Sequence, residues 1–212
     1  MNIIKVEQAM KRFQDNVVLN NVSIDFEKGK TYGIIGRNGS GKTVLFKTIC
    51  GFMPLTSGRI FVRDKQIGKD IDVPDDIGII IEAPGFLPNY SAYRNLSLLA
   101  SIKRKVKPER ICEVLKLVGL DPDNKKHVAK FSLGMRQRLG IAQAIMENPS
   151  ILLLDEPMNG LDNAGVEDMR SLFLKLKDAG TTIILASHNK EDIDALCDSV
   201  FSMDRGIAEQ IR

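Results

Sequence analysis

Residues 36–43, with the sequence GRNGSGKT, match the spacing of a loop that binds phosphate groups, GxxxxGK[ST]. Glycines let the backbone turn tightly, so successive N–H groups point inward at an anion, and a following helix adds its positive N-terminal end. Lys42 is placed to reach the terminal phosphates of a nucleotide, and the Thr43 hydroxyl to ligate Mg²⁺. The residues predicted to hold the nucleotide are Gly36, Asn38, Gly39, Ser40, Gly41, Lys42, Thr43 and Val44.

The flanks of this loop support the same interpretation. The apolar run at 32–35 predicts a buried strand, and residues 44–49 predict a helix. A glycine-rich structural turn followed by an exposed lysine is the alternative, but such a turn needs neither a strand before it nor a helix after it. The loop therefore predicts binding of a nucleoside triphosphate.

Two adjacent carboxylates, Asp155 and Glu156, follow the wholly apolar run at 151–154. Ligands of open α/β sheets bind at the carboxyl ends of the strands, and this run delivers both side chains there. Asp155 is suited to hold Mg²⁺, directly or through water, and Glu156 to polarise a water that faces the terminal phosphate. A strand end followed by an acidic turn is the alternative, and the phosphate-binding loop on the same chain argues against it.

A serine and a glycine, Ser132 and Gly134, mark the start of a predicted helix at 134–146. The N-terminal end of a helix is another place where an anion binds, because its first N–H groups lack partners within the helix. Ser132 as an ordinary helix cap is an alternative that these residues leave open.

Apolar periodicity predicts the elements that position these residues. Strands are expected at 3–8, 22–26, 31–35, 59–62, 77–81, 151–154, 181–186 and 199–203, with a turn-like segment at 11–16 and a final hairpin into 207–209. Helices are expected from 42 to Gly51 and at 94–102, 108–117, 134–146, 165–177 and 191–197. The alternation predicts an α/β fold whose mainly parallel sheet is covered by helices. Residues 84–148 contain no predicted strand, so we expect a helical subdomain inserted into a single domain of residues 1–212.

The composition is that of an ordinary globular protein, with 43% hydrophobic and 27% charged residues in a chain of 212. No apolar stretch reaches the about 20 residues that cross a bilayer, and the N-terminus lacks the apolar core of a signal peptide. Any membrane role is therefore expected to be peripheral. A basic run at 103–107 is expected to be solvated surface, and contact with an anionic lipid surface or partner is its alternative.

The net charge of +3 is too small to indicate a particular anionic partner. Cys50, Cys112 and Cys197 are scattered, with no metal-binding spacing, so we expect reduced, buried thiols and a cytosolic protein. A metal-binding or nucleophilic role for these cysteines is the alternative, and no His or Cys partner lies near them in the sequence.

Taken together, these segments resemble the ATP-binding subunit of an ATP-binding-cassette (ABC) transporter over essentially the whole chain. The signature that distinguishes this family, usually LSGGQ, corresponds here to FSLGM at 131–135, in which Ser132 and Gly134 match and the other residues depart. The resemblance implies a P-loop NTPase (RecA-like) core with a mainly parallel sheet, an N-terminal antiparallel β part and an inserted α-helical subdomain. It also implies a dimer in which the signature of one cassette closes over the ATP held by the other.

Further residues acquire roles only through this resemblance. Phe13 corresponds to an aromatic that stacks on adenine, and Asp162 lies in a loop, 159–162, that passes between two cassettes. His188 corresponds to a histidine that contacts the terminal phosphate, and its place after the strand at 181–186 favours that role. A core phenylalanine and a structural or exposed histidine are the respective alternatives.

Glu82 stands where the family usually has a glutamine that touches Mg²⁺ and links the site to the membrane subunit. A carboxylate there is still able to ligate Mg²⁺ or to accept from a metal-bound water, while it adds negative charge to the site. Residues 81–90 are similar to a branch of cassettes that serves antibiotic or bacteriocin-peptide export and self-immunity. A neutral variant in a cassette of another branch is the alternative.

The resulting hypothesis is a cytoplasmic ATPase subunit, peripheral to the membrane, that binds ATP and Mg²⁺ and drives a separate polytopic membrane subunit. The predicted catalytic residues are Lys42, Glu156 and His188, and the predicted metal ligands are Thr43, Glu82 and Asp155. A second cassette, identical or homologous, is the expected partner, and nucleic acid is not expected. The alternatives are a soluble cassette ATPase that acts on ribosomes or DNA and a regulatory binder that does not hydrolyse ATP.

Overall fold

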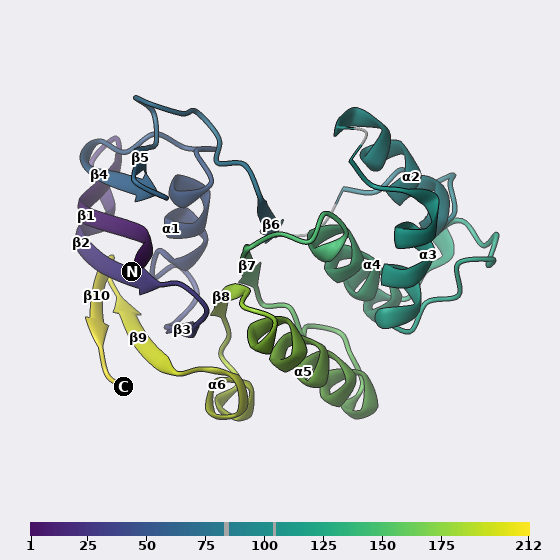
Figure 1. Cartoon of the computed structure of the whole chain (residues 1–212). Helices are drawn as coiled ribbons and strands as arrows, with labels where there is room; N and C mark the ends of the chain where they lie inside the picture. The colour runs from purple at the N-terminus through teal and green to yellow at the C-terminus, as the bar shows by residue number, and fades with distance from the viewer. Residues whose placement is uncertain (83–84, 104) are drawn as a thin grey trace.

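A mixed sheet forms the framework of the computed structural model, which describes residues 1–82, 85–103 and 105–212 (Figure 1). Among these residues the sheet has six strands in the order β10-β9-β3-β8-β7-β6, and its only antiparallel pair is β10 with β9. The mainly parallel sheet predicted from the sequence is thus confirmed. The strands are β3 (Thr31–Ile35), β6 (Ile77–Ile80), β7 (Ile151–Asp155), β8 (Thr182–Ala186), β9 (Ser199–Asp204) and β10 (Ile207–Gln210).

A second sheet is antiparallel, with the order β2-β1-β4-β5 in the described residues. β1 and β2 form one long hairpin in which Phe13 pairs with Asn16, so the predicted turn-like segment at 11–16 is wrong except for Gln14 and Asp15. Register shifts interrupt the β1–β2 pairing, and with it the alternation of apolar and polar residues. The sequence pattern therefore predicts strands that are shorter than those observed. The bounds are β1 (Asn2–Phe13), β2 (Asn16–Glu27), β4 (Ser57–Val62) and β5 (Lys65–Gln66).

Helices cover both faces of the central strands. On one face, α1 (Lys42–Ile49) buries Leu45, Phe46 and Ile49 in a hydrophobic cluster shared with β1, β2, β3, β7 and β8. On the other face, α5 (Asn163–Asp178) and α6 (Lys190–Leu196) contribute to a second cluster with alternate residues of β7 and β8. Burial on both faces explains why residues 151–154 of β7 and 183–186 of β8 are all apolar.

A group of helices lies between β6 and β7 in the chain (Figure 1). α2 packs on α3, α3 on α4, and α4 on β6. The helices are α2 (Ala92–Lys103), α3 (Pro108–Leu117), the 3₁₀ helix η1 (Val128–Lys130) and α4 (Leu133–Ile145). α2 begins two residues before the predicted position, and Pro108 opens α3 as expected of a proline in the first turn. The division of the chain at 84–148 stays a prediction, and residue 84 itself lies outside the described residues.

Three further expectations concern the surface and the cysteines. No helix in the described part of the chain is long and apolar enough to span a membrane. In the basic run, Lys103, Lys105 and Lys107 are exposed, while Arg104 lies outside the described residues. All three cysteines are free thiols, of which Cys50 is buried and Cys112 and Cys197 are only half-buried. The expectation of buried thiols is therefore met fully by Cys50 alone.

Candidate functional site

The phosphate-binding loop connects β3 to α1 and opens into a cavity of ≈ 500 Å³. Its last glycine, Gly41, adopts φ of +110°, and a Cβ there would lie 2.7 Å from the carbonyl oxygen of Val18. Glycine is therefore required where the loop enters the helix. No side chain among the described residues caps α1 through a hydrogen bond. The first turn of α1 lines the cavity, so its N–H groups are suited to an anion.

Two polar side chains of this loop lie buried at the cavity. The Lys42 ammonium donates to the loop's own carbonyls, 2.7 Å from Gly36 O and 3.2 Å from Arg37 O. The buried Ser40 hydroxyl has no hydrogen-bond partner among the described residues. A buried polar group without a partner is costly, and a bound phosphate supplies the missing partner to a hydroxyl in this position. The loop therefore fits the triphosphate that its sequence predicts.

The predicted metal residues Thr43 and Asp155 meet across the site. Thr43 Oγ1, from the first turn of α1, donates to Asp155 Oδ2 at 2.6 Å, at the carboxyl end of β7. The described residues contain no group of three or more His, Cys, Asp or Glu able to hold a metal by themselves. This sparse, all-oxygen donor set suits Mg²⁺, which binds through one or two carboxylates, substrate phosphates and water.

Glu82 lines the same cavity but has a partner within the protein. Its carboxylate accepts from Lys47 of α1 at 2.7 Å, and 64% of the Glu82 side chain is exposed. Glu82, two residues after the end of β6, adopts φ of +61°, an uncommon conformation for a residue with a side chain. The charge that the sequence analysis expects Glu82 to add to the site is therefore balanced by Lys47.

The predicted catalytic pair, Glu156 and His188, comes from the ends of two adjacent strands. β7 and β8 are parallel neighbours, so the residues that follow them meet at one edge of the sheet. His188 Nδ1 lies 3.0 Å from Glu156 Oε2, with the His188 side chain 71% exposed and the Glu156 side chain 22% exposed. The Glu156 N–H donates to Ala186 O at 2.9 Å, which continues the strand pairing past the carboxylates. This contact holds the backbone of Glu156 against the end of β8.

Three cavity residues were not predicted from the sequence as site residues: Val18, Gln137 and Asn159. Gln137, on α4, donates from Nε2 to the carbonyl oxygens of Pro157 at 2.9 Å and Glu156 at 3.3 Å. Gln137 lies two residues after the signature and Asn159 begins the 159–162 loop, so both motifs carried a signal for these residues, whereas Val18 had none. The described residues that line the cavity are Val18, Asn38, Gly39, Ser40, Gly41, Lys42, Thr43, Val44, Glu82, Gln137, Asp155, Glu156 and Asn159.

Comparison with known families identifies this arrangement. The family model described as ABC transporter matches residues 19–159, a span that contains the phosphate-binding loop, the signature and both carboxylates. The chain belongs to the ABC transporter family. It is an ATP-binding subunit of that family, as the sequence resemblance implies.

Curated ABC transporter ATP-binding proteins align with almost all of this chain. An uncharacterized protein of this type from Bacillus subtilis (strain 168), YybJ, is 45% identical, with 98% of this chain and 95% of YybJ covered. The bacitracin transport ATP-binding protein BcrA of Enterococcus faecalis is 38% identical over 96% of this chain and 67% of BcrA. The lantibiotic transport ATP-binding protein SrtF of Streptococcus pyogenes is 37% identical over 93% of this chain and 85% of SrtF. None of these three relatives is named for ribosomes or DNA, so they give the soluble alternative no support.

Solved ABC cassettes have the same fold. A bacterial ABC transporter cassette solved as a dimer superposes with a TM-score of 0.88 at 24% identity, and 99% of each chain is covered. A second cassette, solved in its ADP conformation, superposes with a TM-score of 0.82 at 26% identity over 99% of this chain and 90% of that chain. The P-loop NTPase fold predicted from the sequence is thus confirmed.

Several predicted site residues of this ABC ATP-binding protein lie outside the cavity. Phe13, at the end of β1, is 43% exposed, with the Lys11 ammonium 5.0 Å from its ring centre. Ser132 caps α4 by accepting from Met135 N at 3.2 Å, and Asp162 caps α5 by accepting from Gly165 N at 3.0 Å. The interpretation of Ser132 as a helix cap is therefore correct, and a second role for it stays a prediction.

The signature and the 159–162 loop are in contact within the chain. A Cβ on Gly134 would lie 2.7 Å from the Gly160 carbonyl oxygen, and a Cβ on Gly160 would meet the Leu133 side chain. Glycine at both positions therefore lets the start of α4 pack directly on this loop. Leu133 itself is 65% exposed. The roles predicted for Phe13, Gly134, Asp162 and His188 toward ATP stay predictions.

Proposed function

We propose that this chain is one of two ATP-binding subunits that close on two ATP molecules and drive a separate membrane-spanning subunit at the cytoplasmic face of the membrane. The observation that carries the proposal is that Thr43, Asp155 and Glu156 line the cavity of the phosphate-binding loop and that His188 contacts Glu156. Thr43 meets Asp155 at 2.6 Å, and Glu156 meets His188 at 3.0 Å, at the ends of adjacent parallel strands. This arrangement of side chains supports hydrolysis of ATP as well as its binding.

In the proposed mechanism, the loop N–H groups, Ser40 and Lys42 hold the phosphates of ATP. Lys42 exchanges the two loop carbonyls that it now contacts for phosphate oxygens. Thr43 and Asp155 would hold Mg²⁺, which supplies positive charge against the phosphates. Glu156 orients and polarises the attacking water. His188 donates from Nδ1 to Glu156, and when both ring nitrogens carry a proton its Nε2–H donates to the terminal phosphate.

A second copy or a homologous cassette completes each site in this proposal. The start of α4 is exposed and carries Leu133, an apolar side chain that is 65% open to solvent. Ser132 and Gly134 flank Leu133 at the same helix end. An exposed apolar side chain between small residues supports a role as contact surface for another chain.

We further propose that the transported molecule is a peptide antibiotic or bacteriocin-like peptide. The support is that BcrA is named for bacitracin transport and SrtF for lantibiotic transport. Expressing the chain together with its membrane subunit in a sensitive host should raise the inhibitory concentration of such a peptide. No change across a panel of bacitracin, lantibiotics and unrelated bacteriocins would contradict the substrate class and leave the ATPase role intact.

The proposed hydrolysis is tested by Glu156→Gln. The variant should keep ATP binding and accumulate an ATP-bound dimer, while turnover falls by about 100- to 10,000-fold through loss of the general base. Size-exclusion chromatography with ATP and a phosphate-release assay measure the two effects. Glu147→Gln is a matched control, because Glu147 pairs with Lys103 at 3.2 Å and does not line the cavity. Undiminished turnover of Glu156→Gln removes Glu156 from its role.

The membrane partner requires a separate experiment. Pull-down of the tagged chain from detergent-solubilised membranes of its host should recover a polytopic membrane protein. Recovery of ribosomal proteins or DNA in its place would support the soluble alternative. The amount of chain that sediments with membranes, with and without that partner, tests the peripheral location.

A further inference from the structure

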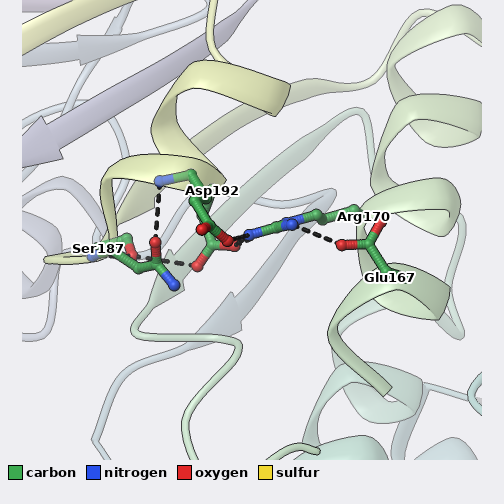
Figure 2. Close-up of polar contacts among 6 residues, drawn as sticks. Glu167, Arg170, Ser187 and Asp192 are labelled. Carbon is green, nitrogen blue, oxygen red and sulfur yellow. Dashed lines mark hydrogen bonds and ion pairs between the residues drawn. The ribbon is translucent and has the colours of Figure 1, made fainter. Parts of the chain in front are cut away.

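A buried ion pair joins α5 to α6 beside the segment that carries His188 (Figure 2). Arg170 of α5 donates from Nε and Nη2 to the same oxygen of Asp192, Oδ1, at 2.8 and 2.6 Å. The Asp192 side chain is 1% exposed and the Arg170 side chain 12% exposed. Arg170 also donates from Nη1 to Glu167 Oε1 at 2.6 Å, which holds the guanidinium from its own helix.

The second oxygen of Asp192 points toward the segment between β8 and α6. Asp192 Oδ2 accepts from the Ser187 hydroxyl at 3.4 Å, and Ser187 Oγ in turn accepts from the Asn189 N–H at 3.1 Å. Ser187 is buried, with 3% of its surface exposed. Both chain neighbours of His188 are therefore connected to the one carboxylate that Arg170 holds.

His188 itself has few restraints beyond this network. Its side chain is 71% exposed, and its contact with Glu156 is the ion-pair distance of 3.0 Å given above. A long exposed side chain keeps one orientation only if the backbone beneath it is fixed. Ser187 contacts the backbone on the far side of His188, so the Arg170–Asp192 pair is connected to the residues on both sides of the imidazole.

Stability alone is a weak reason for such a pair. The cost of removing two charges from water largely cancels their attraction, and apolar side chains of similar size are often as stabilising in that position. Here the arginine donates to one carboxylate oxygen and the serine donates to the other, so the orientation of the carboxylate is defined. The pair is therefore suited to positioning.

α5 also connects this network to the nucleotide cavity. The helix begins directly after the 159–162 loop, whose Asn159 lines the cavity and whose Asp162 caps the first turn. Arg170 lies further along the same helix. One helix and one ion pair thus join the 159–162 loop to the His188 segment.

We propose that Arg170 is a positioning residue for ATP hydrolysis, which acts through Asp192 and Ser187 to hold His188 against Glu156. The inference rests on the proposed roles of Glu156 and His188 and goes beyond them, because neither Arg170, Asp192 nor Ser187 lines the cavity. The competing explanation is that the Arg170–Asp192 pair only holds α5 and α6 together.

Ser187→Ala separates the two explanations, because it removes the hydroxyl and leaves the Arg170–Asp192 pair intact. If Ser187 positions His188, kcat should fall about tenfold, while KM for ATP stays within about twofold. The expected loss is smaller than the about 100-fold loss that follows when a catalytic group is misplaced by about 1 Å. Ser187→Thr restores the hydroxyl and should recover most of kcat. Unchanged kcat in Ser187→Ala overturns the inference.

A spectroscopic readout makes the test independent of turnover. The chain has two histidines, His127 and His188, so the imidazole ¹⁵N spectrum contains two sets of signals, and His127→Gln assigns them. Ser187→Ala, and Arg170→Met if it folds, should shift the His188 signals and leave those of His127 in place. Asp194→Asn is the matched control, because it removes the exposed Arg212–Asp194 pair from the same helix, α6. His188 signals that do not respond to Ser187→Ala contradict positioning.

The failure of this inference is distinguishable from failure of the proposed function. If Glu156→Gln abolishes turnover while Ser187→Ala changes neither kcat nor the His188 signals, only the role of Arg170 is lost. If Glu156→Gln retains full turnover, the proposed hydrolysis mechanism itself is lost. In the His188→Ala background, Ser187→Ala should lower kcat no further, and an additional tenfold loss there means that Ser187 acts without His188.

Discussion

The starts of α1 and α4 show the same element used in two ways. Both are helix N-termini preceded by small residues, and both are predicted from the sequence to bind an anion. No side chain among the described residues caps α1, and its first turn lines a cavity within the chain. The start of α4 is capped by Ser132 and exposes Leu133 on the surface.

This difference shows which half of the ATP site the chain builds for itself. A helix end without a cap, inside a cavity, keeps its N–H groups available for phosphate. A capped, exposed end has already satisfied part of its hydrogen bonding and offers an apolar contact instead. The α1 end is therefore expected to act within one chain, and the α4 end to act on the ATP of a second chain.

The largest effect is expected at the α1 end. Lys42→Ala removes the buried ammonium that faces the loop carbonyls, so kcat/KM for ATP should fall on the order of 1,000-fold. A phosphate-release assay and fluorescent-ATP titration measure the loss. Lys28→Ala, at an exposed turn position, is the control and should keep wild-type values. A functional Lys42→Ala enzyme would mean that α1 is not the ATP-binding helix end.

An intermediate effect is expected at the α4 end. Leu133→Glu places a carboxylate on a side chain that is 65% exposed, so the fold and ATP binding should be retained. The ATP-dependent dimer should weaken on the order of 30-fold, because a residue at the centre of an interface contributes about 2 kcal/mol. Sedimentation with ATP measures the dimer. Ile102→Glu is the control, since Ile102 is another exposed apolar residue, 76% open, on α2.

Mixing these two variants sharpens the comparison. A dimer of Lys42→Ala with Leu133→Glu contains one intact site, made from the α1 end of the Leu133→Glu chain and the α4 end of the Lys42→Ala chain. Hydrolysis by the mixture should therefore exceed the hydrolysis of either impaired protein alone. A mixture no more active than its components would show that both helix ends act within the same chain.

A small effect is expected at Glu82, which Lys47 of α1 holds at 2.7 Å. Since both charges are partly exposed, Glu82→Gln should lower the free energy of unfolding by under about 1 kcal/mol. The Mg²⁺ concentration for half-maximal turnover should change by less than about threefold, whereas Asp155→Asn should raise it by about tenfold or more. If both variants raise it alike, Glu82 is a metal ligand, as the sequence alone predicts.

No change is expected at the other end of α1. Burial raises the pKa of the Cys50 thiol to about 12, so almost none of it is the reactive thiolate near pH 7. Burial likewise raises the pKa of Cys197 to about 12. Iodoacetamide should therefore modify Cys112 first, and mass spectrometry should find Cys50 protected with and without ATP. Labelling of Cys50 after ATP is added would show that ATP binding exposes this thiol and therefore moves the whole of α1. The phosphate would then not bind at a fixed helix end.

The parts of the site predicted from the sequence are those built by local chemistry. The loop at 36–43 needs its glycines within a few residues of each other. The apolar strand before Asp155 predicts that the two carboxylates lie at the end of a strand. The long β1–β2 hairpin was underestimated because bulges break its alternation. Such irregularities follow from the fit of one strand to its neighbours, which a single-strand pattern does not contain.

Contacts between remote segments leave no pattern in the sequence. Lys47 and Glu82 pair across 35 positions of sequence. Arg170 and Asp192 are 22 positions apart, and each looks in the sequence like an ordinary charge on a helix. Tertiary packing alone decides that this pair is buried. These charges therefore required the structure.

The strand order has a consequence for how the protein is made. β3, which supports the phosphate-binding loop, is synthesised early, yet its two neighbours in the sheet are β8 and β9, from the last part of the chain. Thr31 pairs with Ile183, and Tyr32 with Ser199, so these contacts close very long loops and form slowly. A nascent chain that ends before β8 contains the whole GRNGSGKT loop without the strands that hold it. We therefore expect ATP binding to begin only after the C-terminal strands have paired on both sides of β3.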